Sequence, residues 1–171
     1  MKTLRKLGLS LFCTLVTQSG FGDILVNGDF EAPIVPVGSW GITYTAPQYH
    51  ISDPPPEFGW QVGGIDVDLI GSNWQASHGA QSLDLNGSNP GAIYQDFLFP
   101  APGKWHVQFD LSGNPDTAGL RTVRVDLGPV GNLGSLGTYT VDATMRNHTN
   151  MQYETITTVD VEVSDASIPY R

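Results

Sequence analysis

The segment Lys104-Trp105-His106-Val107-Gln108-Phe109-Asp110-Leu111 alternates polar and apolar residues without interruption. In a β-strand, successive side chains point to opposite faces, so the apolar residues share one face and the polar residues share the other. Such alternation is typical of an antiparallel strand that packs one face on a core and turns the other to water. The segment therefore predicts a half-buried strand, with Trp105 as a structural residue of the core.

The same period of two recurs on both sides of this segment. No stretch keeps apolar residues at i, i+3, i+4 and i+7 over three turns, so helices are not expected. Turn signals rich in Gly, Asn and Pro separate the alternating segments. Short strands with regular turns predict an all-β fold, an antiparallel β-sandwich of about eight strands, which fits a jelly roll. The further strands are expected at residues 24–26, 65–69, 82–86, 93–99, 122–127 and 158–163.

Composition narrows the classes of function. The chain has 171 residues, of which 15% are charged, and its net charge is −9 with eight Lys and Arg in all. Binding to nucleic acid or to anionic lipid needs more basic residues than this, so neither partner is expected. Hydrophobic residues make up 40% of the chain, enough for a real core. The single cysteine, Cys13, excludes an intrachain disulfide and a Cys-rich zinc site.

Residues 1–22 have the pattern of a secretory signal peptide. Three basic residues lie among the first six, an apolar run covers residues 7–16, and the small residues Gly20 and Gly22 follow. The apolar run is too short to span a bilayer, and we expect cleavage after Gly22. The mature protein is then a single domain over residues 23–171, secreted or at the cell surface, without a transmembrane segment. The alternative for the apolar run is a buried N-terminal helix.

A proline-rich stretch over residues 32–58 interrupts the strand pattern. Its six prolines exclude a continuous central strand, because proline cannot donate to the hydrogen-bond ladder. The stretch also carries Trp40 and Tyr44. Aromatic residues on a loop of a rigid sandwich are typical of a binding site, so both are candidate ligand contacts. The alternative is that these rings cover one end of the core.

A second pair of candidate contacts, Trp74 and Gln75, lies in the polar, Gly-bounded segment 71–79. The apolar face of a sugar ring stacks on an indole while amide side chains bond its hydroxyls. A Trp beside Asn, Gln and His therefore suits a carbohydrate. The alternative is that Trp74 closes one end of the sandwich.

Catalytic patterns are missing from the sequence, and we expect no enzyme activity. The chain has no nucleophile elbow, zinc-protease motif or phosphate-binding loop, and its four His residues share no metal-ligand spacing. Asp66 and Asp68 share one strand face, which leaves a hydrolase as the weakest hypothesis. Asn27, Asp29 and Glu31 offer oxygen ligands of the kind that calcium prefers.

Four segments in order resemble one known family: residues 25–31 (Leu-Val-Asn-Gly-Asp-Phe-Glu), 67–70 followed by 74–76, 79–87 and 109–116. Together they resemble the bacterial choice-of-anchor C family, and they are similar to the plant cell-wall proteins with domain of unknown function 642. The resemblance implies a galactose-binding-domain-like jelly roll, exported and often surface-anchored, and the plant relatives are associated with cell-wall polysaccharide. The resemblance covers residues 24–158.

The resemblance also implies roles for single residues. In the wider superfamily the opening Asn-x-x-Phe-Glu helps to build a structural calcium site, which carries over to Asn27 and Glu31, while Phe30 would enter the core. Calcium is therefore the one cofactor we expect. The chain departs from the family at its end, where the usual closing strand and anchor are missing. We expect a truncated C-terminal end, or a replacement strand at 159–163 with Asp160 as its acidic residue.

The sequence thus favours a secreted, non-catalytic module that binds a polysaccharide or a cell-surface glycan. Its expected contacts are Trp40, Tyr44, Trp74 and Gln75. The alternative is a structural or adhesive extracellular matrix protein that docks a protein partner through the aromatic loop. No pattern in the sequence addresses the identity of the ligand or the oligomeric state.

Overall fold

The protein is built from short antiparallel strands, and the computed structural model describes residues 9–16, 24–49 and 51–171. Two single-turn 3-10 helices, η1 (Pro47–Tyr49) and η2 (Pro56–Phe58), are the helical elements of these residues. The strands are β1 (Leu9–Val16), β2 (Gly41–Thr45), β3 (Gln61–Gly64), β4 (Asp66–Ile70), β5 (Ser82–Asp84), β6 (Gly91–Tyr94), β7 (Gly103–Gly113), β8 (Leu120–Leu127), β9 (Gly134–Asp142), β10 (Glu154–Thr157) and β11 (Val161–Val163).

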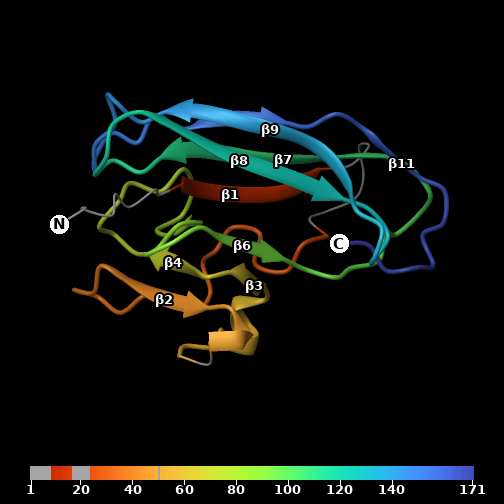
Figure 1. The fold of residues 1–171 in the computed structure, drawn as a ribbon, viewed down its shortest axis with the longest axis horizontal. Helices are drawn as coiled ribbons and strands as arrows, with labels where there is room; N and C mark the ends of the chain where they lie inside the picture. Colours follow the sequence, from red (N-terminus) through yellow and green to blue (C-terminus); the bar gives the residue numbers. More distant parts are fainter. Residues whose placement is uncertain (1–8, 17–23, 50) are drawn as a thin grey trace.

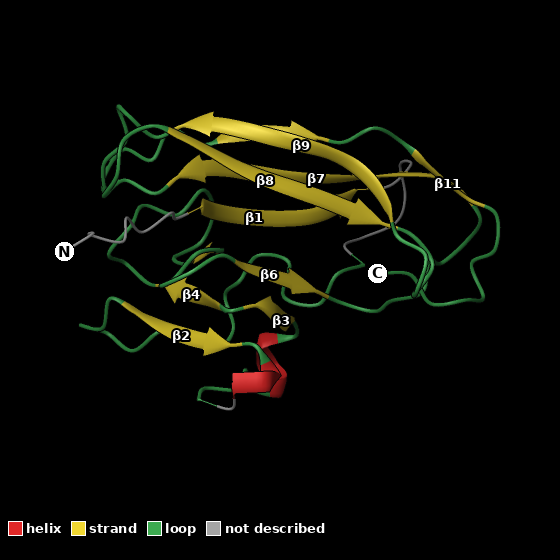
Figure 2. Ribbon diagram, viewed as in Figure 1, coloured by secondary structure: helices red, strands yellow, loops and turns green. Residues whose placement is uncertain are grey.

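The strands form one large sheet and two small ones. The large sheet has the order β10-β7-β1-β5-β4-β2, and β11 pairs with the start of β7. The small sheets are β3-β6 and β8-β9, and every pairing is antiparallel. In Figure 1, β8 and β9 lie at the top and β2 at the bottom, with β1 and β7 between them. Figure 2 shows how little of the chain is helical. The predicted all-β, antiparallel fold is confirmed, while jelly-roll connectivity stays a prediction.

The hydrophobic core lies on one face of the large sheet. In β7, Trp105, Phe109 and Leu111 are 4%, 1% and 1% exposed, as the alternation of the sequence predicts. Val62 of β3 and Val141 of β9 belong to the same cluster, so both small sheets pack against this face. The structural role expected for Trp105 is confirmed.

The strand predicted at residues 24–26 is wrong, because this segment is a bend followed by a turn. A side chain takes the place of a neighbouring strand there. Gln95 accepts a hydrogen bond from the Val26 N–H (N···Oε1 3.1 Å) and donates one to the Val26 carbonyl (Nε2···O 2.6 Å). Both ladder groups of Val26 are therefore satisfied. Asn27 then turns the chain with a φ of 51°, a left-handed conformation that Asn tolerates.

The proline-rich stretch contains one short strand, β2, at the edge of the large sheet. β2 lies between Pro36 and Pro47 and pairs with β4. This position agrees with the expectation that no central strand runs through residues 32–58, since prolines are tolerated beside an edge strand.

Part of the expected signal peptide is placed in the fold. Residues 9–16 form β1, a strand rather than the buried helix considered as the alternative. Residues 1–8 and 17–22, including the expected cleavage point after Gly22, lie outside the described residues. Removal of the signal peptide stays a prediction. The described part of the chain holds no helix long and apolar enough to cross a membrane.

The C-terminal strands line β7 on the side away from β1. β10 pairs with the middle of β7 and β11 with its start. The replacement strand considered at 159–163 thus corresponds to β11, an edge strand. Its acidic residue, Asp160, meets His106 of β7 (Oδ1···Nδ1 3.4 Å). A truncated C-terminal end stays a prediction.

Candidate functional site

The large sheet is buried on both faces at β4 and β5, where the alternation of the sequence predicted one wet face. Every residue of these two strands is buried. Val67 and Leu69 belong to the core, whereas Asp68 lies on the opposite, outer face in register with Asp84 of β5. Asp68 is 5% exposed and Asp84 is 3% exposed. Two carboxyl groups therefore lie side by side beneath the loops that cover the outer face.

A pocket of about 210 Å³ lies at these carboxyl groups. It is smaller than the roughly 300–1,000 Å³ of a drug-sized site, so it suits one small ring. None of its described lining residues is Lys or Arg. Its chemistry-bearing side chains are Asp68 and Asp84 from the sheet, Trp40 before β2, Trp74 from the 71–79 loop, and Asn114 and Asp116 after β7.

Neighbouring groups hold the two carboxyl groups in place. Thr43 of β2 donates its hydroxyl to Asp68 (Oγ1···Oδ1 2.5 Å), and Asn114 donates its amide to Asp84 (Nδ2···Oδ2 3.3 Å). Gly87 packs directly on Asp68, because a Cβ at this position would lie 2.8 Å from both carboxylate oxygens. Glycine is required there by close approach, and the approach keeps the Asp68 side chain beside the pocket.

Trp74 is a buried wall of the pocket. It is 4% exposed and packs with Ile70 and Met151 in a small cluster outside the main core. Its indole Nε1 is buried and has no hydrogen-bond partner among the described residues. Leaving a buried donor unpaired costs about 1–3 kcal/mol, and most native donors are paired, so this atom is a candidate ligand contact. The two interpretations of Trp74, closing the fold and meeting a ligand, are compatible.

Gln75, the other contact predicted in this loop, joins two loops instead. Its Oε1 accepts from the Met151 N–H (3.0 Å), and its own N–H donates to the His148 carbonyl (2.7 Å). The Tyr153 hydroxyl donates to the Gln75 carbonyl (3.0 Å). Gln75 therefore positions Trp74 and does not line the pocket.

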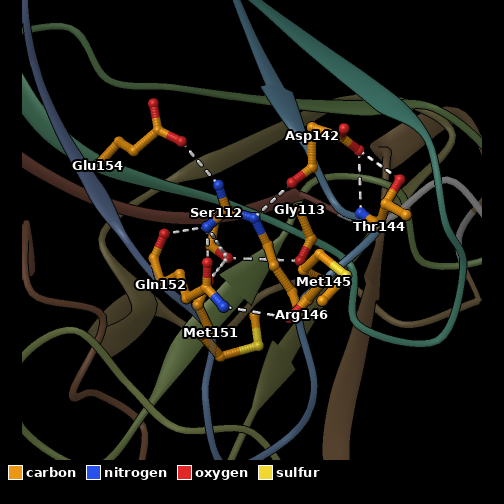
Figure 3. A network of polar contacts seen from close by, with 9 residues as sticks. All are labelled: Ser112, Gly113, Asp142, Thr144, Met145, Arg146, Met151, Gln152 and Glu154. Atoms are coloured by element: carbon orange, nitrogen blue, oxygen red, sulfur yellow. Dashed lines mark hydrogen bonds and ion pairs between the residues drawn. The ribbon is translucent and has the colours of Figure 1, made fainter.

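Arg146 anchors the loop that carries Met151, the residue whose N–H bonds to Gln75. Figure 3 shows Arg146 and its contacts with this loop. Its side chain is 5% exposed. Nη1 donates to the Met151 carbonyl (2.6 Å), and Nε donates to the Asp142 carbonyl (2.8 Å). Nη2 pairs with Glu154 Oε1 at 2.7 Å. One guanidinium thus connects the end of β9, the start of β10 and the residue packed under Trp74.

Asp116 is held at the pocket by His148. The imidazole Nε2 lies 2.7 Å from Asp116 Oδ1. The same ring stands edge-on to Trp74, with centroids 6.5 Å apart. Trp74, His148 and Asp116 therefore form one connected wall.

The two aromatic residues predicted from the proline-rich stretch are separated by the fold. Trp40 is 49% exposed and lines the pocket. Tyr44 is 3% exposed and packs on Phe58 in the core, with centroids 4.7 Å apart. Burial raises the pKa of the Tyr44 phenol, and the charge of Glu57 adds to the effect. Tyr44 thus covers the core, the alternative interpretation, because it is in register with Val67 on the core face of β4.

Asn27 and Glu31, the calcium ligands that the resemblance implies, bond to the backbone of the protein, and calcium binding stays a prediction. Asn27 Oδ1 accepts from the Ala32 N–H (2.9 Å), and Nδ2 donates to the carbonyls of Ala32 (2.6 Å) and Phe58 (2.9 Å). Glu31 Oε1 accepts from the N–H groups of residues 80–81 (2.8 and 2.9 Å). The Asn27 amide and Oε1 of Glu31 are thus bonded to the backbone of the protein itself. In the described part of the chain, no group of three or more His, Cys, Asp or Glu could hold a metal ion.

The opening turn supports the site from a distance. Phe30 is fully buried and lies 5.6 Å from the Trp60 ring, as the resemblance implies. Gln81 donates to the Phe30 carbonyl (Nε2···O 2.7 Å) and accepts from the Val35 N–H (N···Oε1 2.5 Å). These bonds tie the turn to the end of the loop that carries Trp74.

Asp66, the other half of the carboxylate pair predicted on β4, serves a turn. Its Oδ1 accepts from the N–H groups of Ser88 (2.9 Å) and Asn89 (3.2 Å). Asp66 and Asp68 therefore share a strand but have different partners, and Asp68 alone of the two lines the pocket.

A larger cavity of about 740 Å³ lies between β6 and β8. Its lining is mostly apolar and includes Trp60, Phe97 and Phe109. It lies where the described strand pairings do not join the two small sheets. We place the candidate site at the smaller pocket, because the side chains that can recognise a polar ligand converge there.

Three pocket residues were given no role by the sequence: Asp84, Asn114 and Asp116. Asp84 has the strand alternation of a wet face, and the other two lie in a turn signal. All three fall within segments that carry the family resemblance, 79–87 and 109–116. The resemblance therefore indicated these three positions but not that their side chains line a pocket.

The fold and the pocket define an all-β, antiparallel protein with an acidic, indole-lined pocket on the outer face of its large sheet. Comparison with curated proteins finds a partial similarity to Halomucin from Haloquadratum walsbyi, 30% identical over 100 residues. The match covers 58% of this chain and 1% of the length of that protein, which does not assign a family. No protein-family model matches the chain, and no solved structure matches it.

Proposed function

We propose that the protein is a secreted, non-catalytic module that binds one sugar residue of a polysaccharide or cell-surface glycan beside Trp40 and Trp74. The observation that carries the proposal is that Trp74, whose buried Nε1 has no partner among the described residues, lines a pocket with three carboxyl groups. A sugar hydroxyl both donates and accepts, so it satisfies the indole and a carboxylate together. The half-exposed ring of Trp40 offers an apolar face for stacking.

The charge of the lining limits the class of sugar. Asp68, Asp84 and Asp116 bring three carboxyl groups, without Lys or Arg among the described lining residues. An acidic sugar would meet like charges in a partly desolvated pocket, which is unfavourable. We therefore expect neutral or amino sugars to bind and uronic or sulfated sugars to be rejected.

Trp40 gives the direct test. The full chain of residues 1–171, which keeps β1, is titrated with neutral, amino and acidic oligosaccharides by calorimetry, beside Trp40→Ala and the control Tyr49→Ala. Tyr49 is also exposed but does not line the pocket. Loss of the stacking ring should weaken binding about tenfold, or about 1.4 kcal/mol, without changing the melting temperature. Equal binding by Trp40→Ala and wild type would remove the proposed site.

Trp74→Phe tests whether the indole Nε1 of Trp74 donates a hydrogen bond to the sugar. Phenylalanine keeps most of the packing against Ile70 and Met151 but removes Nε1. The loss of one hydrogen bond of about 1 kcal/mol predicts roughly fivefold weaker sugar binding. Stability should rise or stay the same, because the unpaired buried donor is gone. Unchanged affinity would show that Nε1 does not meet the sugar.

Three observations support a location outside the cell or at its surface. The partial similarity to Halomucin and the all-β fold are compatible with a secreted or cell-surface protein. The leader-like sequence at residues 1–22 points the same way.

A protein partner remains the second candidate, and one observation favours it. Ile34 and Val37 are 81% and 104% exposed in the loop that leads to Trp40. Clustered exposed apolar side chains are typical of interaction surfaces. If this surface binds a protein partner, the double variant Ile34→Ser with Val37→Ser should no longer bind that partner but should still bind the sugar.

A further inference from the structure

The position of β1 in the large sheet is unusual for a segment that resembles an export signal. β1 is the strand between β5 and β7 and is antiparallel to both. Its eight residues pair with β7 from Leu9↔Gly113 to Val16↔His106, and Ser10 and Leu11 also pair with β5. In the described pairings, β1 is what joins the β7 half of the sheet to the β5 half.

The same residues form the apolar run of the expected signal peptide, upstream of the expected cut after Gly22. Cleavage would remove β1 from the middle of the sheet. Strands on either side of a vacant position lie about 9.6 Å apart, twice the strand spacing, which is too far for direct hydrogen bonds. The backbone groups of β5 and β7 that face this position would then lack partners.

The register defines the segment that fits this position. Residues at alternate positions lie opposite Val107, Phe109 and Leu111, which are buried in the core. Directly opposite residues of antiparallel strands share a face, so these positions call for apolar side chains. The intervening positions lie opposite buried Asp84 and Asp110 on the outer face. Acidic residues are unfavourable there, because like charges directly opposite one another destabilise a strand pair.

We propose that the exported protein is a strand acceptor: the position between β5 and β7 binds an extended segment of another polypeptide, antiparallel to both strands. The segment has about eight residues, the length of the ladder with β7, with apolar residues at alternate positions and no Asp or Glu between them. This inference does not require that the protein binds a sugar, and it gives the protein a partner of defined chemistry.

Filling this position also completes the sugar pocket. β5 carries Asp84, and Asn114 directly follows the last residue of β7. These two residues are hydrogen-bonded across the position of β1 (Nδ2···Oδ2 3.3 Å). A strand between β5 and β7 fixes their spacing, so the binding of the segment should order one wall of the pocket.

The test begins with the full gene expressed with export, followed by intact mass of the product. The expected mass is that of residues 23–171. A synthetic peptide with the sequence of residues 9–16, carrying Cys13→Ser, is then added. It should raise the melting temperature in a concentration-dependent way, or restore a cooperative transition if the exported chain is unfolded by itself. A peptide that also carries Leu11→Asp is the control and should do neither.

A disulfide in the expected register makes the test specific. The chain has one cysteine, Cys13, which leaves with the leader. A peptide with Cys13→Ser and Thr14→Cys should cross-link to the Gln108→Cys protein, because residues 14 and 108 are register partners. Lys104→Cys, whose register partner lies on β11, is the protein control and should not react selectively.

Three results would overturn the proposal. The first is an exported protein that retains residues 9–16, because the position would never be vacant. The second is no effect of the peptide on melting or refolding. The third is equal cross-linking of Gln108→Cys and Lys104→Cys. Sugar binding by the same samples is measured separately, so failure of one proposal is distinguishable from failure of the other.

Discussion

The opening turn at residues 27–31 and the pocket over β4 and β5 are both rich in polar side chains, yet they differ in whether a buried donor is left unpaired. Asn27 and Glu31 bind backbone groups of residues 32, 58 and 80–81. At the pocket, Trp74 Nε1 is buried without a partner among the described residues. A polar cluster whose atoms are already paired supports the fold, whereas one with an unpaired buried donor is open to a ligand.

Arg146→Ala should give the largest loss of stability, because Arg146 supports the loop that packs against Trp74 of the pocket. The substitution removes the guanidinium bonds to the Asp142 and Met151 carbonyls, and the Met151 carbonyl keeps only the Ser112 hydroxyl as a side-chain donor. We expect a loss of about 3 kcal/mol in the free energy of unfolding, measured by urea denaturation, with weaker sugar binding, because several hydrogen bonds from one charged group are lost together. The control Arg124→Ala breaks an exposed pair with Asp126 and should cost about 0–1 kcal/mol. Similar losses in both variants would contradict the role of Arg146.

Asn27→Ala tests the opening turn. It removes three hydrogen bonds to the backbone and a residue that tolerates a φ of 51°. We expect about 2–3 kcal/mol lower stability in chemical denaturation. Sugar affinity of the folded fraction should be unchanged, because Asn27 does not line the pocket. A variant with native stability and reduced affinity would make the turn part of the binding site.

Melting with and without calcium tests whether the opening turn binds an ion. Because Asn27 and Glu31 are occupied by the backbone, neither calcium nor a chelator should shift the melting temperature of the exported protein. A bound ion would stabilise by RT ln(1 + [L]/Kd), or about 2.7 kcal/mol at a hundredfold excess over Kd. A calcium-dependent rise that Glu31→Gln abolishes would restore the ion site that the family resemblance implies.

Asp96 and Arg171 lie outside both regions and give the smallest expected effect. The hydrogen bond from Arg171 (Nε···Oδ1 2.6 Å) lowers the pKa of Asp96 below its usual value. A lowered pKa in the folded state contributes stability above the unfolded pKa, and this contribution is lost as pH falls through the folded pKa. Asp96→Asn should therefore differ slightly from wild type in thermal melting at pH 7 and converge with it in acid. A difference that grows in acid would contradict this sign.

The strands could be predicted where the sequence alternates, and the candidate site only in part. Alternation fixes which residues of β7 enter the core, so Trp105 was assigned correctly. Alternation could not reveal that loops cover the outer face of β4, so the Asp68 side chain was expected to be exposed to solvent. Trp40 and Trp74, predicted as ligand contacts from their local sequence, both line the pocket. The sequence left two interpretations of Tyr44 open, because the side on which it lies depends on the register with β4.

The amino-acid sequence by itself determined the all-β class, the antiparallel strands and the acidic charge balance. These follow from periodicity and composition, which are local properties. Tertiary structure alone decided that Asp68, Asp84, Asn114 and Asp116 meet at one pocket, and that β1 lies between β5 and β7. Such meetings depend on strand order and loop placement, because residues distant in sequence become neighbours only when the sheet has formed.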